Sequence, residues 1–155
     1  LVKERLKPLS DKLNYDIFKN FYKFGVIRNP FDTIVSHYYW INSLNNHNAK
    51  SITFKEILKE LESNKYPNYD LLNLNKLMDK NFDEVLCDKI IKYEDLNKDL
   101  SLVFNKLGVP FDGKLNIFKK KSNRNENYRK FFNNDTKKII EKIYWKDMKM
   151  FDYGF

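Results

Sequence analysis

Hydrophobic and polar positions follow two different periods along this chain. Residues 21–27 (Phe-Tyr-Lys-Phe-Gly-Val-Ile) form an apolar, aromatic run of strand length. Beyond this run, Asn29 is a residue type that caps helices, and Pro30 suits the first helical position. The apolar residues that follow recur at helical spacing and form one stripe, at Phe31, Ile34, Val35, Tyr38 and Ile41. The pattern predicts a strand that ends at Arg28, followed by a helix that fades near residue 45.

Further along the chain the pattern predicts another helix and another strand. Ser51 or Thr53 begins a helix with apolar residues on one face. The stretch 66–83 is rich in leucine and interrupted by Pro67, which fits a helix or a buried loop. The run Glu-Val-Leu-Cys-Asp-Lys-Ile-Ile-Lys, residues 84–92, predicts a second strand.

The remainder of the chain is predicted to be helical with an aromatic tail. Asp95 caps a helix that Gly108 ends. A last helix begins at about Asp135 with Asn134 as its cap. The tail, residues 150–155, is aromatic, and we expect it to dock on the core.

Strands that alternate with helices predict an α/β domain with a parallel sheet. A length of 155 residues fits a single domain over residues 1–155. Two strands alone make a poor sheet, and the chain begins with Leu1 instead of Met. Both features lead us to expect that a neighbouring part of the domain is missing from this chain.

The charge balance favours anionic partners. The net charge is +8, with 29 Lys and Arg against 21 Asp and Glu. Residues 114–130 hold seven basic residues and a single acid, Glu126. Nucleic acid, phosphorylated cofactors, acidic polysaccharide and anionic membranes all suit such a balance, although a solvated basic loop is an equally good reading of this segment.

Residue counts exclude several classes of site. The single cysteine, Cys87, excludes an internal disulfide and a cysteine-based zinc site, and its apolar neighbours predict a small buried residue. His37 and His47 lie ten residues apart and form no metal-ligand pair by themselves. No apolar stretch has the length of a membrane span, and no signal-peptide pattern is recognised. Because we expect the chain to be a fragment, this says little about the compartment of the parent protein.

The junction at Arg28 is the most informative site. Ligands of open α/β sheets bind beyond the carboxyl ends of strands, and a helix N-terminus there suits an anion. Arg28 adds planar donors that match phosphate. Ser36 lies on the helix side shared by Thr33 and Trp40, from which its hydroxyl can donate to the same phosphate. The alternative is that Arg28 makes a structural ion pair and Ser36 is an ordinary surface serine.

Residues 26–38 (Val-Ile-Arg-Asn-Pro-Phe-Asp-Thr-Ile-Val-Ser-His-Tyr) resemble the 3′-phosphate-binding signature of sulfotransferases that use 3′-phosphoadenosine 5′-phosphosulfate. The closest likeness is to the carbohydrate type of the Golgi and its bacterial and viral relatives. Residues 51–58, the Tyr-Glu-Asp-Leu run at 93–96, and the segment from 128 to the end of the chain resemble further motifs in the family's order. The resemblance covers about residues 15–155, as the C-terminal part of the family domain.

The resemblance implies a three-layer sandwich like that of P-loop NTPases, with a parallel sheet. The N-terminal strand and the loop for the 5′-phosphosulfate are not found in this chain, so the fragment alone is expected to lack part of the donor site. In the family, the residues that match Arg28 and Ser36 contact the 3′-phosphate. A family loop that closes over the nucleotide is matched only approximately, with Ser122 as its best equivalent and Lys121 and Arg124 as electrostatic support.

The implied activity is transfer of a sulfuryl group from the nucleotide donor to a hydroxyl or amine of a carbohydrate acceptor, with no metal. His37 is a candidate catalytic residue beside Ser36, whereas Glu94 fits a structural role better than that of a general base. A bacterial or viral parent implies the cytoplasm, and a eukaryotic one the Golgi lumen. Two alternatives stay open: a sulfotransferase-like binding domain without catalysis, and a basic module that binds nucleic acid through its aromatic residues.

Overall fold

The computed structural model describes residues 20–44, 51–63, 77–78, 85–116 and 124–155. They fall into two compact units. The first unit holds the described residues up to Arg28 and those from Leu77 to Asn116, and the second holds the others, from Asn29 onward. The sequence predicts a single domain over the whole chain, and that remains a prediction.

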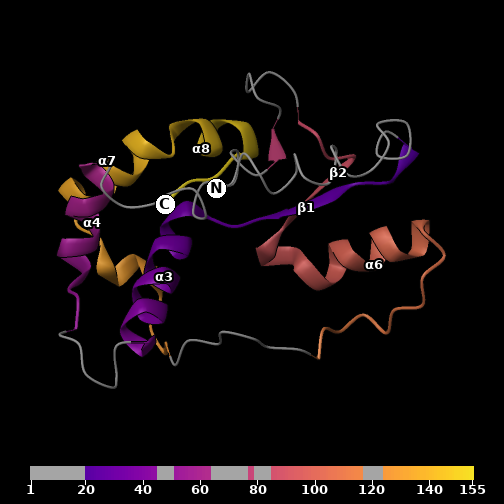
Figure 1. Ribbon diagram of the computed structural model, residues 1–155, viewed down its shortest axis with the longest axis horizontal. Coiled ribbons are helices and arrows are strands. Elements are labelled where there is room, and N and C mark those ends of the chain that lie inside the picture. Colours follow the sequence, from indigo (N-terminus) through magenta and orange to yellow (C-terminus); the bar gives the residue numbers. More distant parts are fainter. Residues whose placement is uncertain (1–19, 45–50, 64–76, 79–84, 117–123) are drawn as a thin grey trace. The chain divides into compact units, whose positions relative to one another are not determined.

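The first unit is built on a parallel sheet of two strands, β1 (Phe24–Ile27) and β2 (Lys89–Lys92). Helix α6 (Leu96–Lys106) follows β2 through a short 3-10 turn, η2 (Tyr93–Asp95), and packs against that strand (Figure 1). A buried cluster joins strand to helix through Ile91, Leu100 and Val103. The predicted α/β class with a parallel sheet is therefore confirmed.

The start of the sheet is fixed by a clamp between Lys23 and Asp88. The Lys23 backbone N–H donates to Asp88 Oδ2 at 2.7 Å, and Lys23 Nζ lies 3.2 Å from the same oxygen. The Asp88 N–H in turn donates to Lys23 O at 2.7 Å. These bonds lower the pKa of the Asp88 carboxyl, with the backbone hydrogen bond as the largest cause. They set the register in which Val26 pairs with Ile91.

The second strand is shorter than predicted. It begins at Lys89, and the described residues 85–88 are not part of it, because Asp88 bends to reach the Lys23 N–H. Residue 84, where the predicted strand begins, lies outside the described residues. Val85 forms an isolated antiparallel bridge with Met78. Cys87 is half-buried, not fully buried as predicted, and burial raises the pKa of its thiol.

The sequence predicted the C-terminal end of α6 correctly but not its N-terminal cap. Asp95 makes no side-chain capping hydrogen bond, because the preceding 3-10 turn takes its backbone out of the extended conformation that a capping residue needs. The C-terminus follows the prediction. Gly108 has a φ of 66°, and the Val109 N–H donates to Phe104 O at 2.9 Å, as in a Schellman motif.

The second unit is helical, and its core is aromatic. It contains α3 (Pro30–Leu44), α4 (Phe54–Glu62), the 3-10 turn η3 (Tyr128–Phe131), α7 (Asn134–Ile143) and α8 (Trp145–Phe151). The ring of Phe31, fully buried in α3, meets the rings of Tyr128, Phe132 and Phe155 at centroid distances of 6.5, 5.1 and 5.0 Å. Docking of the aromatic tail is thereby confirmed.

Helix α4 begins as the sequence predicts. The Glu56 N–H donates to Thr53 Oγ1, and the Thr53 N–H donates back to Glu56 Oε2 at 2.7 Å, which completes a capping box. The buried side of the helix consists of Ile57, Leu58 and Leu61.

The predicted last helix is two helices, and its predicted cap is one residue out. Asn133, not Asn134, caps α7. Its side chain accepts from the Thr136 N–H, and the Asn133 N–H donates to Thr136 Oγ1 at 2.9 Å, so the two residues form a capping box. The chain bends at Tyr144, which is fully buried, before α8 begins. The Tyr144 N–H donates to Ile140 O at 2.8 Å, at the end of α7.

Candidate functional site

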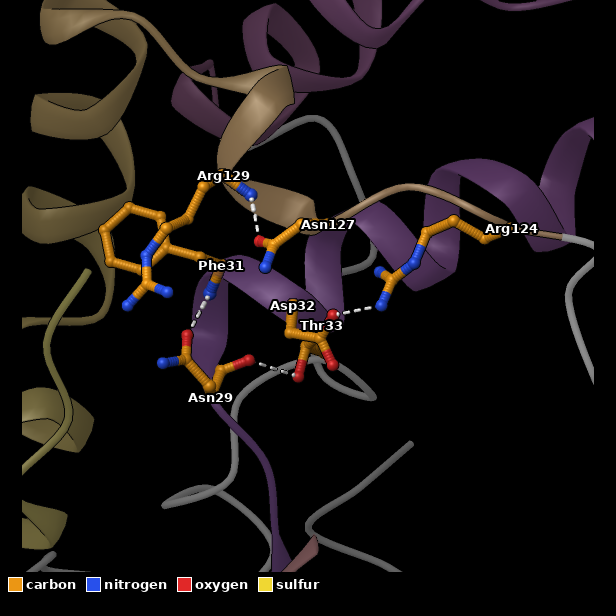
Figure 2. Close-up of polar contacts among 7 residues, drawn as sticks. All are labelled: Asn29, Phe31, Asp32, Thr33, Arg124, Asn127 and Arg129. Atoms are coloured by element: carbon orange, nitrogen blue, oxygen red, sulfur yellow. Dashed lines mark hydrogen bonds and ion pairs between the residues drawn. The ribbon is translucent and has the colours of Figure 1, made fainter. Parts of the chain in front are cut away.

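The sequence from Asn29 onward starts α3 by a tight local cap. The Phe31 N–H donates to Asn29 Oδ1 at 2.9 Å (Figure 2). The Thr33 N–H donates to Asn29 O at 2.9 Å. Pro30 has no N–H to offer. Since Asn29 already accepts from the first turn, phosphate binding near this helix is better assigned to side chains than to its N-terminal amides.

Arg28 lies at the carboxyl edge of the parallel sheet, where open α/β sheets bind ligands. It follows β1 directly, as Tyr93 follows β2, and the register places the two strand ends side by side. The Arg28 guanidinium carbon lies 4.4 Å from the centroid of the Tyr93 ring. Stacking fixes the plane of the guanidinium, and its N–H donors lie along the edges of that plane.

Tyr93 is a candidate site residue that the sequence pattern does not single out. Its motif points instead to the carboxylates of Glu94 and Asp95, yet both belong to an exposed 3-10 turn. Tyr93 is itself 47% exposed. Its position in the sequence could have identified Tyr93, since a residue directly after a parallel strand lies next to the residue that follows the neighbouring strand.

Ser36 is half-buried on α3, at the seventh helical position. It lies about 9 Å along the axis from Pro30 at 1.5 Å per residue. A phosphate that accepts from its hydroxyl therefore lies beside the helix and not off its end. Thr33, on the same side, donates its hydroxyl to Asn29 O at 3.0 Å. The convergence of Arg28 and Ser36 on one phosphate remains a prediction from the signature.

Arg124, in the basic segment, reaches the signature helix. Its Nη2 atom lies 2.6 Å from Oδ1 of Asp32, in the first turn of α3 (Figure 2). The exposed fractions of the two side chains are 17% and 14%, so the pair is mostly buried. Asp32 is the second residue that sequence reasoning missed, because an acid in a first helical turn is common. Lys121 and Ser122 lie outside the described residues.

His37 is half-buried on α3, and its ring lies 5.5 Å from that of Trp40. Its catalytic role remains a prediction. Within the described ranges, His, Cys, Asp and Glu form no group of three or more that could hold a metal ion. No helix in those ranges is both long and apolar enough to cross a membrane.

The sulfotransferase family model matches residues 2–154 of the chain. The chain belongs to the sulfotransferase family. The match includes both units and every site residue described above, and it supports sulfuryl transfer as the general activity. No curated protein and no solved structure matches the chain.

Proposed function

We propose that this sulfotransferase uses 3′-phosphoadenosine 5′-phosphosulfate as its donor and holds the donor's 3′-phosphate with Arg28 and Ser36, assisted by Arg124. The observation that carries the proposal is the 2.6 Å ion pair that joins Arg124 to Asp32 on α3. It brings a cation of the basic segment to the helix that bears Ser36. Lys121 and Ser122, which precede Arg124 in that segment, are proposed to contribute to the same site.

The residue types suit a phosphate dianion. An arginine presents planar donors that match two phosphate oxygens, and a serine hydroxyl donates a further hydrogen bond. The Tyr93 ring orients Arg28 before any ligand arrives, so less rotamer freedom is lost on binding. A nucleotide without a 3′-phosphate forgoes these contacts.

The proposed anchors position the donor and take no part in bond making. In the reaction, an acceptor oxygen or nitrogen attacks the sulfur in line, and the bond between sulfur and the bridging oxygen of the donor breaks. The acceptor loses its proton to a base, and the electron pair of the broken bond stays on the nucleotide's 5′-phosphate. A fixed 3′ end holds the 5′ end in line for attack, which is an effect of orientation. His37 is the candidate for that base within this chain.

We propose a carbohydrate acceptor on two grounds, the likeness of residues 26–38 to carbohydrate sulfotransferases and the net charge of +8. A polysaccharide that already carries sulfate or carboxylate groups is anionic, and a basic protein attracts it over several ångströms. The exposed side chains of Arg129 and Lys130 belong to the same basic segment.

Binding of adenosine 3′,5′-bisphosphate tests the proposal by calorimetry, with adenosine 5′-monophosphate as the reference ligand. We expect the bisphosphate to bind more tightly. Arg28→Ala should weaken its binding by about 1.5–3 kcal/mol, the range for a hydrogen bond to a charged group, and Ser36→Ala by about 1 kcal/mol or more. Neither substitution should change binding of the monophosphate.

Two further residues provide matched controls, the exposed Arg129 and the half-buried Ser101. Arg129→Ala removes an arginine whose guanidinium lies over the Tyr128 ring, and Ser101→Ala removes a helical hydroxyl that donates to Asn97 O. Both should leave binding unchanged. Equal affinity for the two nucleotides would refute the assignment of Arg28. Salt-dependent binding to random oligonucleotides without nucleotide preference would favour a nucleic-acid module instead.

A further inference from the structure

The ion pair between Asp32 and Arg124 joins residues 92 positions apart in the sequence. Arg124 Nη2 lies 2.6 Å from Asp32 Oδ1, and both side chains are mostly buried. Another pair in this segment joins Lys130 Nζ to Glu126 Oε1 at 3.7 Å, and its side chains are 68% and 52% exposed. A short, mostly buried pair holds its partners far more firmly than a solvated one.

Only one edge of the Arg124 guanidinium is used by Asp32. In the part of the chain that the structure describes, Arg124 Nη1 is buried and has no hydrogen-bond partner. A buried donor without a partner is unfavourable, and native proteins retain few of them. The pair therefore presents an oriented cationic donor that an anionic ligand can satisfy.

The location of this donor on α3 is set by helical spacing. Asp32 precedes Ser36 by four residues, so their Cβ atoms lie about 5–6 Å apart on one side of the helix. A guanidinium held by Asp32 is thereby brought to the flank of α3 that carries Ser36. A phosphate that accepts from the Ser36 hydroxyl would lie on this flank as well.

We propose that Asp32 is a positioning residue, which holds Arg124 in the orientation that binds the donor's 3′-phosphate. This inference rests on the proposed function. Asp32 also carries a negative charge that repels phosphate, so the two effects have opposite signs. Burial decides between them: without Asp32, the guanidinium loses its counter-charge in a mostly buried place and is driven toward solvent, away from the ligand.

A double-mutant cycle on binding of adenosine 3′,5′-bisphosphate tests the inference. Arg124→Ala should weaken binding about ten- to a hundredfold, the effect of losing a charged hydrogen bond. Asp32→Ala should weaken it about tenfold, by displacing Arg124. The variant with both substitutions should bind no more weakly than Arg124→Ala alone, because the effect proposed for Asp32 on the ligand runs through Arg124. Glu126→Ala, the matched control, should leave binding unchanged.

A purely structural role would not depend on the 3′-phosphate. The loss in Asp32→Ala should therefore disappear when adenosine 5′-monophosphate is the ligand. If Asp32→Ala does not fold, Asp32→Asn takes its place, since it keeps the size of the side chain and removes only its charge from the ion pair with Arg124, and a smaller loss of about threefold is expected.

Three results would overturn the role of Asp32. They are unchanged or tighter bisphosphate binding in the Asp32 variant, an equal loss for the monophosphate, and a loss that persists when Arg124 is already alanine. In each of these cases the proposed function stands as long as Arg28→Ala and Ser36→Ala still weaken bisphosphate binding selectively. If those two variants are also without effect, the 3′-phosphate site itself is refuted.

Discussion

Asn29 makes two structural contacts with one side chain, so its replacement by alanine tests the account of α3. Its Oδ1 atom accepts from the Phe31 N–H at 2.9 Å and caps the helix. Its Nδ2 atom donates to Gly154 O at 2.9 Å and ties the C-terminal tail to the start of α3. The residue is only 9% exposed, so water does not readily replace either bond.

The size of the effect follows from adding the two losses. Removing an N-cap side chain costs about 1 kcal/mol. Leaving the Gly154 carbonyl without its donor in a partly buried place costs about 1–3 kcal/mol. Asn29→Ala should therefore lower the free energy of unfolding by about 2–4 kcal/mol. That is a large share of the roughly 5–15 kcal/mol that stabilises a typical domain.

Urea unfolding followed by circular dichroism measures this loss, and two further variants divide it. Asn133→Ala removes a comparable cap, but Asn133 is exposed and holds only α7, so about 1 kcal/mol is expected. Asn29→Asp keeps an oxygen that caps α3 but loses the donor to Gly154 O, so it should fall between wild type and Asn29→Ala.

A loss of stability in Asn29→Ala no larger than that in Asn133→Ala would refute the role of Asn29 in holding the tail. That result would mean that the hydrogen bond to the tail contributes nothing beyond the cap. The same role is also refuted if Asn29→Asp is as stable as wild type, because the tail contact would then need no donor.

Two predictions concern the first unit. Gly25→Ala should lower the free energy of unfolding, measured in urea, by about 1–3 kcal/mol, because a Cβ at this buried strand position would overlap the Leu77 side chain. A variant as stable as wild type would contradict this packing. Asp88→Asn should reduce the loss of stability in acid. The hydrogen bond from the Lys23 N–H lowers the pKa of the Asp88 carboxyl, so the ionised carboxyl stabilises the fold above its unfolded pKa of about 3.9. That stabilisation is lost as the pH falls below this pKa. Comparing urea midpoints at pH 5 and pH 3 tests this, and an unchanged acid dependence in the variant would count against the clamp.

The features that the sequence predicted correctly depend on neighbours a few residues apart. The start of α3 follows from Asn29 and Pro30, and that of α4 from the reciprocal bonds of Thr53 and Glu56. Gly108 ends α6 because a positive φ costs glycine little. Such preferences act within one turn of helix, so they can be read without knowing the fold.

The helix and strand boundaries that the sequence predicted wrongly depend on which of several suitable residues makes the hydrogen bond. Asn133 and Asn134 are equally suited to cap α7, and the position of Thr136 selects the first. The apolar run 84–92 fits a strand throughout, but the bond from Lys23 to Asp88, 65 residues away, delays its start to Lys89.

For the site, the chain alone identified the family-like signature with Arg28 and Ser36, and it identified Arg124 as part of a basic segment. Only the tertiary structure could show that Tyr93 stacks on Arg28 and that Asp32 holds Arg124. Local sequence fixes which residues begin a helix or follow a strand, since those choices depend on nearby backbone groups. Which side chains meet across 65 or 92 residues depends on strand register and helix packing, and no short-range pattern encodes these.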